Sequence, residues 1–152
     1  MAKVKIMNYN VWRGFHTFGH VFQQERLDAA RRVVDKEQPD LLALTEAWHY
    51  DVVDHQKAFN FPYAYRAPFP REDQNEPIKS NMLLARFPLE AQVINLSPRR
   101  AALRAQYSFK GKMLAVDVVH PQVQCTEEEK IQELQPLFPF PSNHYILTGD
   151  FN

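Results

Sequence analysis

Five polar residues suited to metal and phosphate chemistry each stand at the end of an apolar run in the sequence. They are Asn10, Glu46, His120, Asp150 and Asn152. The runs that precede them have the composition of β-strands, so each residue is predicted at the carboxyl end of a strand. In α/β sheets, ligand sites form outside those ends. The sequence therefore predicts one shared site, provided that these strands are neighbours in space.

The five residue types fit the hydrolysis of a phosphoester with a divalent ion. Glu46 offers a hard oxygen ligand, and Mg²⁺ prefers one or two carboxylates together with water and substrate oxygens. Such an ion polarises a phosphoryl oxygen and offsets charge in the transition state. His120 is suited to hydrogen-bonding a phosphate oxygen or protonating a leaving group. Asp150 is suited to orienting or deprotonating a water, while Asn10 and Asn152 orient phosphate or water without adding charge.

Each of these residues also has a simple structural interpretation. Asp150 and Asn152 favour turns, and Asn10 at a strand end is suited to capping the following loop. Glu46 alone is compatible with a solvated carboxylate, and His120, before a proline, with a loop histidine. What favours the functional interpretation is their common placement at strand ends.

Other candidates lie close to these strand ends. Arg13, in the loop after Asn10, is a candidate substrate-binding residue, although an arginine in a loop is more often solvated. Trp12 and Trp48 are placed either to stack on a substrate or to pack in the wall of the site. The pair His16 and His20 has a zinc-like spacing, but glycines around it predict a loop rather than a helix, and no zinc site is expected.

The overall composition indicates one globular domain without a strong charge. The chain has 152 residues, 45% of them hydrophobic, and its 18 basic residues balance its 18 acidic ones. A zero net charge argues against a protein that holds nucleic acid mainly by long-range attraction to phosphates. A local basic patch remains open, because Arg99, Arg100 and Arg104 lie close together in the sequence.

The sequence also indicates where the protein works. Its single cysteine, Cys125, excludes an internal disulfide and a cysteine-based zinc site. Lys3 and Lys5 interrupt the first apolar run, so no signal peptide is predicted. No stretch is long and apolar enough to span a bilayer. A cytoplasmic location is the expectation, with any further C-terminal segment unknown.

The order of predicted elements favours an α/β architecture. A strand at 4–11, a helix at 25–36 and a strand at 41–45 make a βαβ-like start. Residues 50–59 are predicted as a short helix and 60–80 as mostly loop. Further strands are predicted at 81–86, 92–96, 101–109, 113–119 and 145–148. A capping box of Thr126 and Glu129 predicts a helix with Ile131 and Leu134 facing inward.

The candidate residues lie in segments that resemble known motifs. "KIMNYNVWRG" resembles the opening strand of the endonuclease/exonuclease/phosphatase superfamily, with Asn10 at the strand end. "PDLLALTEAW" resembles the motif Asp-aliphatic-aliphatic-x-Leu-Gln-Glu of that family. There Glu46 matches the metal ligand, and Thr45 replaces the usual glutamine.

Three later segments continue the resemblance in family order. "SNMLLARFPL" is similar to a strand that usually ends in Ser-Arg-x-Pro, with Ala85 in place of the serine. "MLAVDVVHP" resembles the strand ending in Thr-His-Leu, and in it His120 is flanked by Val119 and Pro121 instead. "ILTGDFN" is close to the family's Gly-Asp-Phe-Asn.

The resemblance implies a fold and a partial domain. The family is a two-sheet α/β sandwich covered by helices (the DNase I-like fold), and residues 1–152 match its N-terminal half, with the C-terminal half missing. The family's later Asp, further Asn and closing Ser-Asp-His are absent from the sequence. We therefore expect a single partial domain that ends at the Gly-Asp-Phe-Asn motif and is inactive alone. Apolar faces meant for the other half would favour self-association through an unfilled sheet face.

The resemblance also implies a divalent-metal-dependent phosphodiesterase or phosphatase. Glu46 and Asn10 would bind Mg²⁺, with Mn²⁺ as a possible substitute. Asp150 and Asn152 would align water and phosphate, and His120 would stabilise the phosphoryl oxygen. The substrate stays open between lipid, nucleotide and nucleic acid. "YNVWRG" resembles sphingomyelinase-like members, but six residues do not determine a substrate. The alternatives are a DNA or RNA nuclease of the same fold and a non-catalytic binding module.

Overall fold

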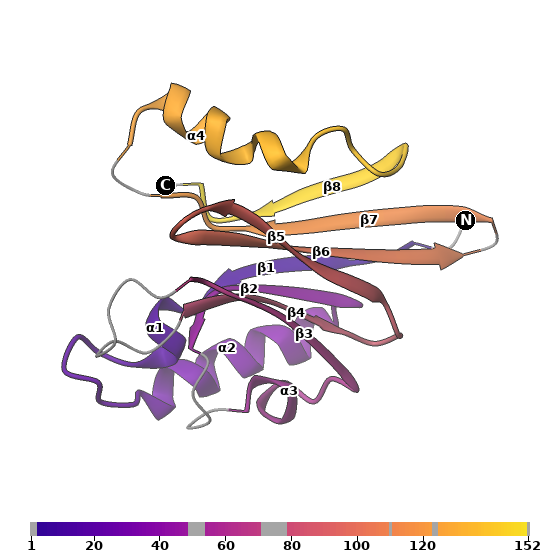
Figure 1. Cartoon of the computed structure of the whole chain (residues 1–152). Helices are drawn as coiled ribbons and strands as arrows, with labels where there is room; N and C mark the ends of the chain where they lie inside the picture. The colour runs from indigo at the N-terminus through magenta and orange to yellow at the C-terminus, as the bar shows by residue number, and fades with distance from the viewer. Residues whose placement is uncertain (1–2, 49–53, 71–78, 110, 123–124, 152) are drawn as a thin grey trace.

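Two four-stranded sheets pack face to face, with helices on the outer side of each (Figure 1). The computed structural model describes residues 3–48, 54–70, 79–109, 111–122 and 125–151. The first sheet has the order β1-β2-β4-β3, formed by β1 (Ile6–Asn10), β2 (Leu41–Trp48), β3 (Tyr63–Pro68) and β4 (Lys79–Ala85). The second has the order β5-β6-β7-β8, formed by β5 (Glu90–Ser97), β6 (Arg100–Phe109), β7 (Lys112–Val119) and β8 (His144–Gly149).

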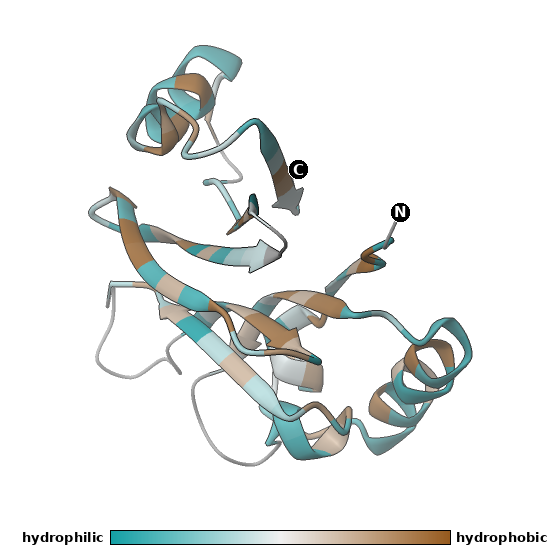
Figure 2. Ribbon diagram, turned by 90° about the vertical axis from the view of Figure 1, so that its right-hand side faces the viewer, coloured by the Kyte–Doolittle hydropathy of each residue, from teal (hydrophilic) through white to brown (hydrophobic). Residues whose placement is uncertain are grey.

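The helices cover both outer faces of the paired sheets. They are α1 (Trp12–Phe15), α2 (Gln24–Glu37), α3 (His55–Ala58), α4 (Glu127–Leu134) and the 3₁₀ turn η1 (Gln135–Leu137). Figure 2 shows α4 on one side of the sheets and α2 on the opposite side, with hydrophobic and hydrophilic residues alternating along both helices. Among the described residues, no helix is both long and apolar enough to cross a membrane.

Each sheet contains one parallel strand pair, and the two pairs determine where the site forms. β1 pairs with β2 in parallel, and β7 pairs with β8 in parallel, whereas the other strand pairs are antiparallel. A parallel pair places both of its carboxyl ends at the same edge of the sheet. Asn10 at the end of β1, His120 after β7 and Asp150 after β8 therefore lie at the carboxyl edges of the two parallel pairs.

The predicted βαβ start is confirmed. In α2 the predicted inward residues Leu27, Ala30 and Val34 are all buried. Strand β2 is buried on both faces, as its continuous apolar run predicts: Leu42 packs with the helices, and Leu41 packs between the two sheets. This rigid centre holds the carboxyl ends of β1 and β2 in place.

The region predicted as loop between residues 60 and 80 contains strand structure instead. Strand β3 (Tyr63–Pro68) pairs with β4, which begins at Lys79 rather than Asn81. Two prolines close to β3 obscured it, although an edge strand tolerates proline because one side of its backbone needs no partner. The helix predicted at 50–59 is present as α3 (His55–Ala58), and residues 50–53 of that prediction lie outside the described residues.

Helix α4 has its predicted capping box, but only one of the two residues predicted on its inner face points inward. The Thr126 hydroxyl accepts a hydrogen bond from the Glu129 backbone, and the Glu129 carboxylate accepts one from the Thr126 N–H. Ile131, expected inward, is 64% exposed. Leu134 packs inward as predicted. Beside it lies the buried Glu133, whose carboxylate accepts hydrogen bonds from the Ser97 hydroxyl and the Gln122 N–H, so a satisfied carboxylate rather than Ile131 completes the inner face.

Arg104 is not part of a surface basic patch. Its guanidinium makes a bidentate ion pair with Asp117, through contacts of 2.8 and 2.6 Å. It also donates to the Leu137 carbonyl, and the Tyr145 hydroxyl donates to the same Asp117 carboxylate. This buried network joins β6, β7 and β8. Only Arg99 and Arg100 of the three arginines remain near the surface.

Candidate functional site

Four of the five predicted site residues come together at the carboxyl ends of the two parallel strand pairs. Glu46, His120 and Asp150 each offer one ligand atom, and these atoms lie within 4.8 Å of one another. Asn10 bridges the two carboxylates, because its Nδ2 donates to Asp150 Oδ2 at 2.6 Å and to Glu46 Oε1 at 3.2 Å. The fifth residue, Asn152, lies outside the described residues.

The amide of Asn10 is held in one orientation. Its Oδ1 accepts a hydrogen bond from the Trp12 backbone N–H at 2.7 Å. An amide has one acceptor end and one donor end. With the acceptor taken by the backbone, the donor end must face Glu46 and Asp150. A neutral group therefore holds two carboxylates together without cancelling their charge.

Glu46 reaches the site from a bulge, not from a strand end as predicted. Strand β2 continues to Trp48, and its register against β4 shifts between Leu44 and Ala47. Glu46 has a φ of 57°, a conformation that is uncommon for residues other than glycine. A bulge redirects a side chain that the strand alternation would point elsewhere, and bulges gather next to functional sites.

The surroundings of Glu46 keep its carboxylate ionised. Burial raises its pKa, but this is outweighed by His120, by the hydrogen bond from Asn10 and by the charge of Lys79, so the pKa falls to about 2. The Lys79 ammonium lies 3.8 Å from Glu46 Oε2. Lys79 is the site residue that sequence reasoning missed. Its only available signal is the β2–β4 register, which pairs it with Trp48.

His120 is buried beside the two carboxylates. Its Nε2 lies 3.5 Å from Glu46 Oε1 and 4.0 Å from Asp150 Oδ2. Among the described residues, neither ring nitrogen has a hydrogen-bond partner of good geometry. A buried polar atom without a partner is costly, so this imidazole is suited to a group bound between it and the acids.

Asp150 is positioned by a glycine that no other residue can replace. Gly149 has a φ of 152°, and a Cβ built on it would lie 1.9 Å from the Val119 carbonyl oxygen. This close approach lets the Asp150 N–H donate to the same carbonyl. The Gly149 carbonyl accepts a hydrogen bond from Asn8 Nδ2, which ties β8 to β1. The ends of the two sheets are thereby joined at the site.

The remaining sequence candidates lie next to this cluster. The Arg13 guanidinium lies over the Phe18 ring, 4.4 Å from its centroid, and within the described parts of the chain it makes no hydrogen bond to the acidic cluster of Glu46, His120 and Asp150. Trp48 is buried and stacks with His16 at 4.4 Å, while His20 lies 5.4 Å from the same ring. For Trp48, wall packing is therefore the correct interpretation.

Comparisons with known proteins support the fold. No protein-family model and no curated protein match the sequence. Among solved structures, the human Nocturnin catalytic domain with bound sulfate anion is 21% identical, with a TM-score of 0.72 over 98% of this chain and 64% of that one. A *Leptotrichia buccalis* endonuclease/exonuclease/phosphatase family protein is 16% identical, with a TM-score of 0.72 over 99% and 68%.

A third solved structure, *D. rerio* TDP2 complexed with single strand DNA product, is 16% identical with a TM-score of 0.69 over 97% and 60% of the two chains. These similarities confirm the predicted fold: the chain has the two-sheet α/β sandwich of these structures, the DNase I-like fold. It spans between 38% and 68% of the length of the structures that it matches.

Proposed function

We propose that this chain carries the metal-binding and phosphate-binding part of a divalent-metal-dependent phosphoester hydrolase. The observation that supports the proposal best is the convergence of Glu46, His120 and Asp150 around Asn10, at one end of a DNase I-like sandwich. Motif order in the sequence and geometry at the strand ends agree on the same four residues. Because the chain spans only part of the matched structures, hydrolysis is proposed for the complete domain, and this chain alone is expected to be inactive.

The donor set fits a hard divalent cation. Glu46 and Asp150 offer carboxylate oxygens, which Mg²⁺ prefers, with Mn²⁺ as a substitute, and Glu46 stays ionised at neutral pH because its pKa is about 2. Asn10 lies between the two acids and is assigned to the same site. When bound there, such an ion would polarise a phosphoryl oxygen and offset charge in the transition state.

The protein's own side chains then have separate tasks. Asp150 aligns a water and, together with Asn152, the phosphate. His120 donates a hydrogen bond from its buried ring to a phosphoryl oxygen or to the leaving oxygen, for which its Nε2 is available. Asn10 bridges the two carboxylates and holds them in a fixed geometry, so that little reorganisation is needed during the reaction.

A metal titration tests this assignment directly. Isothermal calorimetry of the chain with Mg²⁺ is expected to show one saturable site, and Glu46→Gln is expected to abolish it. Glu90→Gln, an exposed acid at the start of β5, serves as the control and should bind like the parent. If Glu46→Gln in a complete domain retained full activity and metal dependence, the proposal would be wrong.

A nuclease is the second candidate, because one of the matched structures is *D. rerio* TDP2 with a single strand DNA product. Hydrolysis of plasmid DNA, sphingomyelin and a generic aryl phosphodiester by a complete domain separates the nuclease, the lipid phosphodiesterase and the non-catalytic binding module. Metal binding without hydrolysis of any of the three would favour the binding module.

A further inference from the structure

Two arginines and two aromatic rings form a continuous stack directly after Asn10. The Arg26 guanidinium lies 4.8 Å from the centroid of the Trp12 ring. Trp12 meets Phe18 edge to face, with centroids 5.2 Å apart, and the Arg13 guanidinium lies 4.4 Å from the Phe18 centroid. We call these four residues the arginine–aromatic stack.

The stack is fixed to the site by an unusual turn. In α1 (Trp12–Phe15) φ is positive at every residue, between 38° and 69°. Such backbone costs about 1–2 kcal/mol per non-glycine residue. The turn is held because Phe15 is buried in the core and Gly14 packs against Trp48. The Trp12 N–H also donates to Asn10 Oδ1. The stack is therefore anchored to Asn10, the residue that bridges the two acids.

The stack presents positive charge and an exposed ring in the segment that begins two residues after Asn10. Within the parts of the chain that the structure describes, no ion pair joins Arg13 or Arg26 to an acid. Phe18 is 68% exposed, although it is a large apolar residue. The turn lies at the end of the sheets where β1 terminates (Figure 1).

Rings interleaved with arginines match the chemistry of single-stranded nucleic acid. Bases stack on aromatic side chains whatever their sequence, and arginines contribute both phosphate contacts and cation–π contacts. A lipid surface would also accept exposed Phe18 and Val21. However, in this stack each ring already contacts a guanidinium, an arrangement that suits a polyanion with flat bases better than an apolar membrane interior.

We propose that Trp12, Arg13, Phe18 and Arg26 form a binding subsite for single-stranded nucleic acid beside the acidic cluster. A base stacks on the open face of Phe18, and the two arginines contact the flanking phosphates. The inference deepens the proposed function, on which it rests for the reaction, because it assigns the substrate class of that site. Binding itself needs no metal and no hydrolysis.

Two labelled ligands that differ only in their bases test the proposal. Fluorescence anisotropy in EDTA compares a short oligothymidylate with an abasic strand of the same length. The parent chain is expected to prefer the oligothymidylate. Phe18→Ala should weaken binding of the oligothymidylate about tenfold and remove the preference. Arg13→Met should weaken both ligands, because it removes a phosphate contact.

Matched variants elsewhere on the surface serve as controls. Phe138→Ala removes another exposed phenylalanine, and Arg32→Met removes an exposed arginine of α2. Both should bind like the parent. Phe18→Ala should also bind Mg²⁺ like the parent, so that oligonucleotide binding and Mg²⁺ binding are separate readouts. The two proposals can therefore fail separately.

Three results would overturn the inference. One is equal affinity of the parent and Phe18→Ala for oligothymidylate. Another is the absence of any preference for bases over the abasic strand in the parent chain. The third is binding to vesicles of phosphatidylserine and phosphatidylcholine, lost in Phe18→Ala, without binding to either strand, which would assign the surface to membranes.

Discussion

Lys79 places a positive charge where the proposed metal would bind. Its ammonium lies 3.8 Å from Glu46 Oε2, and both side chains are largely shielded from water. We expect Lys79→Met to tighten Mg²⁺ binding, because the competing cation is gone. The expected gain in affinity is about two- to fivefold, which corresponds to the free energy of a partly exposed ion pair. Calorimetric titration measures this affinity. Lys57→Met, which removes an exposed lysine of α3, serves as the control. Unchanged or weaker Mg²⁺ binding would contradict the competition.

His55 gives the fold a dependence on pH that is separate from the site. It is buried, and among the described residues neither ring nitrogen has a hydrogen-bond partner. Burial, with a smaller effect of Arg66, lowers its pKa from 6.5 to about 4. The unfolded chain therefore binds a proton that the folded chain does not, over the range between these two values. The free energy of unfolding should be constant above about pH 7 and fall by roughly 3 kcal/mol between pH 6.5 and 4.

Denaturant unfolding at a series of pH values measures that fall. His55→Leu removes the titrating ring, which makes no hydrogen bond within the described residues, so it should flatten the curve over this range. Glu46, whose pKa is about 2 in the folded chain against an ordinary 4.5, adds a separate fall that begins at about pH 5 and continues toward pH 2, so the upper part of the range reports on His55. An unchanged slope in His55→Leu would show that other groups cause the acid sensitivity.

At the scale of single residues, the sequence predicts those that directly follow apolar runs. Asn10, His120 and Asp150 lie at strand ends as expected, and Glu46 reaches the same cluster although a bulge delivers it. Lys79 could not be found in this way, because its position depends on the pairing of β2 with β4. A strand register is a long-range property that a local pattern does not encode.

At the scale of elements, the contact between β7 and β8 depends on Gly149. A Cβ at this position would overlap the Val119 carbonyl, so the strands must separate and Asp150 must move. We expect Gly149→Ala to lower the free energy of unfolding by well over 1 kcal/mol and to weaken Mg²⁺ binding. Gly111→Ala is the matched control: it has a positive φ but nothing within 4 Å of the new Cβ. If both variants lost the same stability, backbone strain alone would explain the effect.

The ion pair of Arg104 and Asp117 holds β6 and β7 together inside the second sheet. Arg104→Met leaves Asp117 buried without its counter-charge, which typically costs about 3–5 kcal/mol. Adding Asp117→Leu removes that charge, so the double variant should recover most of the loss. Equilibrium unfolding of the parent, both single variants and the double variant measures the coupling. Additive losses would mean that the two groups do not depend on each other.

Elements that carry their own local signal were predictable, and those that depend on a partner were not. The spacing of residues along the sequence predicts both the buried face of α2 and the capping box of α4. By contrast, β3 has prolines at its borders and forms because β4 pairs with it. Arg104 looked like a solvated residue of a hairpin, because its partner Asp117 stands thirteen positions away on the next strand.

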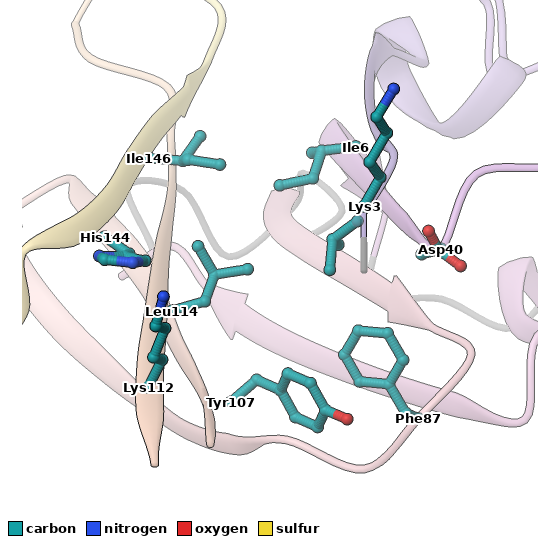
Figure 3. A pocket seen from close by; sticks show the side chains of 10 residues that line it. Lys3, Ile6, Asp40, Phe87, Tyr107, Lys112, Leu114, His144 and Ile146 are labelled. Atoms are coloured by element: carbon teal, nitrogen blue, oxygen red, sulfur yellow. The ribbon is translucent and has the colours of Figure 1, made fainter. Parts of the chain in front are cut away.

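At the scale of the whole molecule, a cavity opens between the two sheets, at the end of the strands opposite the acidic cluster. It has a volume of about 420 Å³, and its walls are mostly apolar. Figure 3 shows Ile6 of β1 and Ile146 of β8 on opposite sides of it, with Leu114, Phe87 and Tyr107 among the other lining residues. Within the described residues, β1 and β8 are the outermost strands of their sheets on this side.

Two open strand edges above an apolar cavity favour association between copies of the chain, because unpaired edges and apolar patches seek partners. Sedimentation velocity should show a faster species that grows with protein concentration. Ile146→Lys should shift the population toward the monomer, since it places a charge in the cavity wall. Ile131→Lys, on the exposed face of α4, should leave association unchanged. A monomer at every concentration would refute the prediction, and an equal effect of both variants would place the contact on α4 instead of at the cavity.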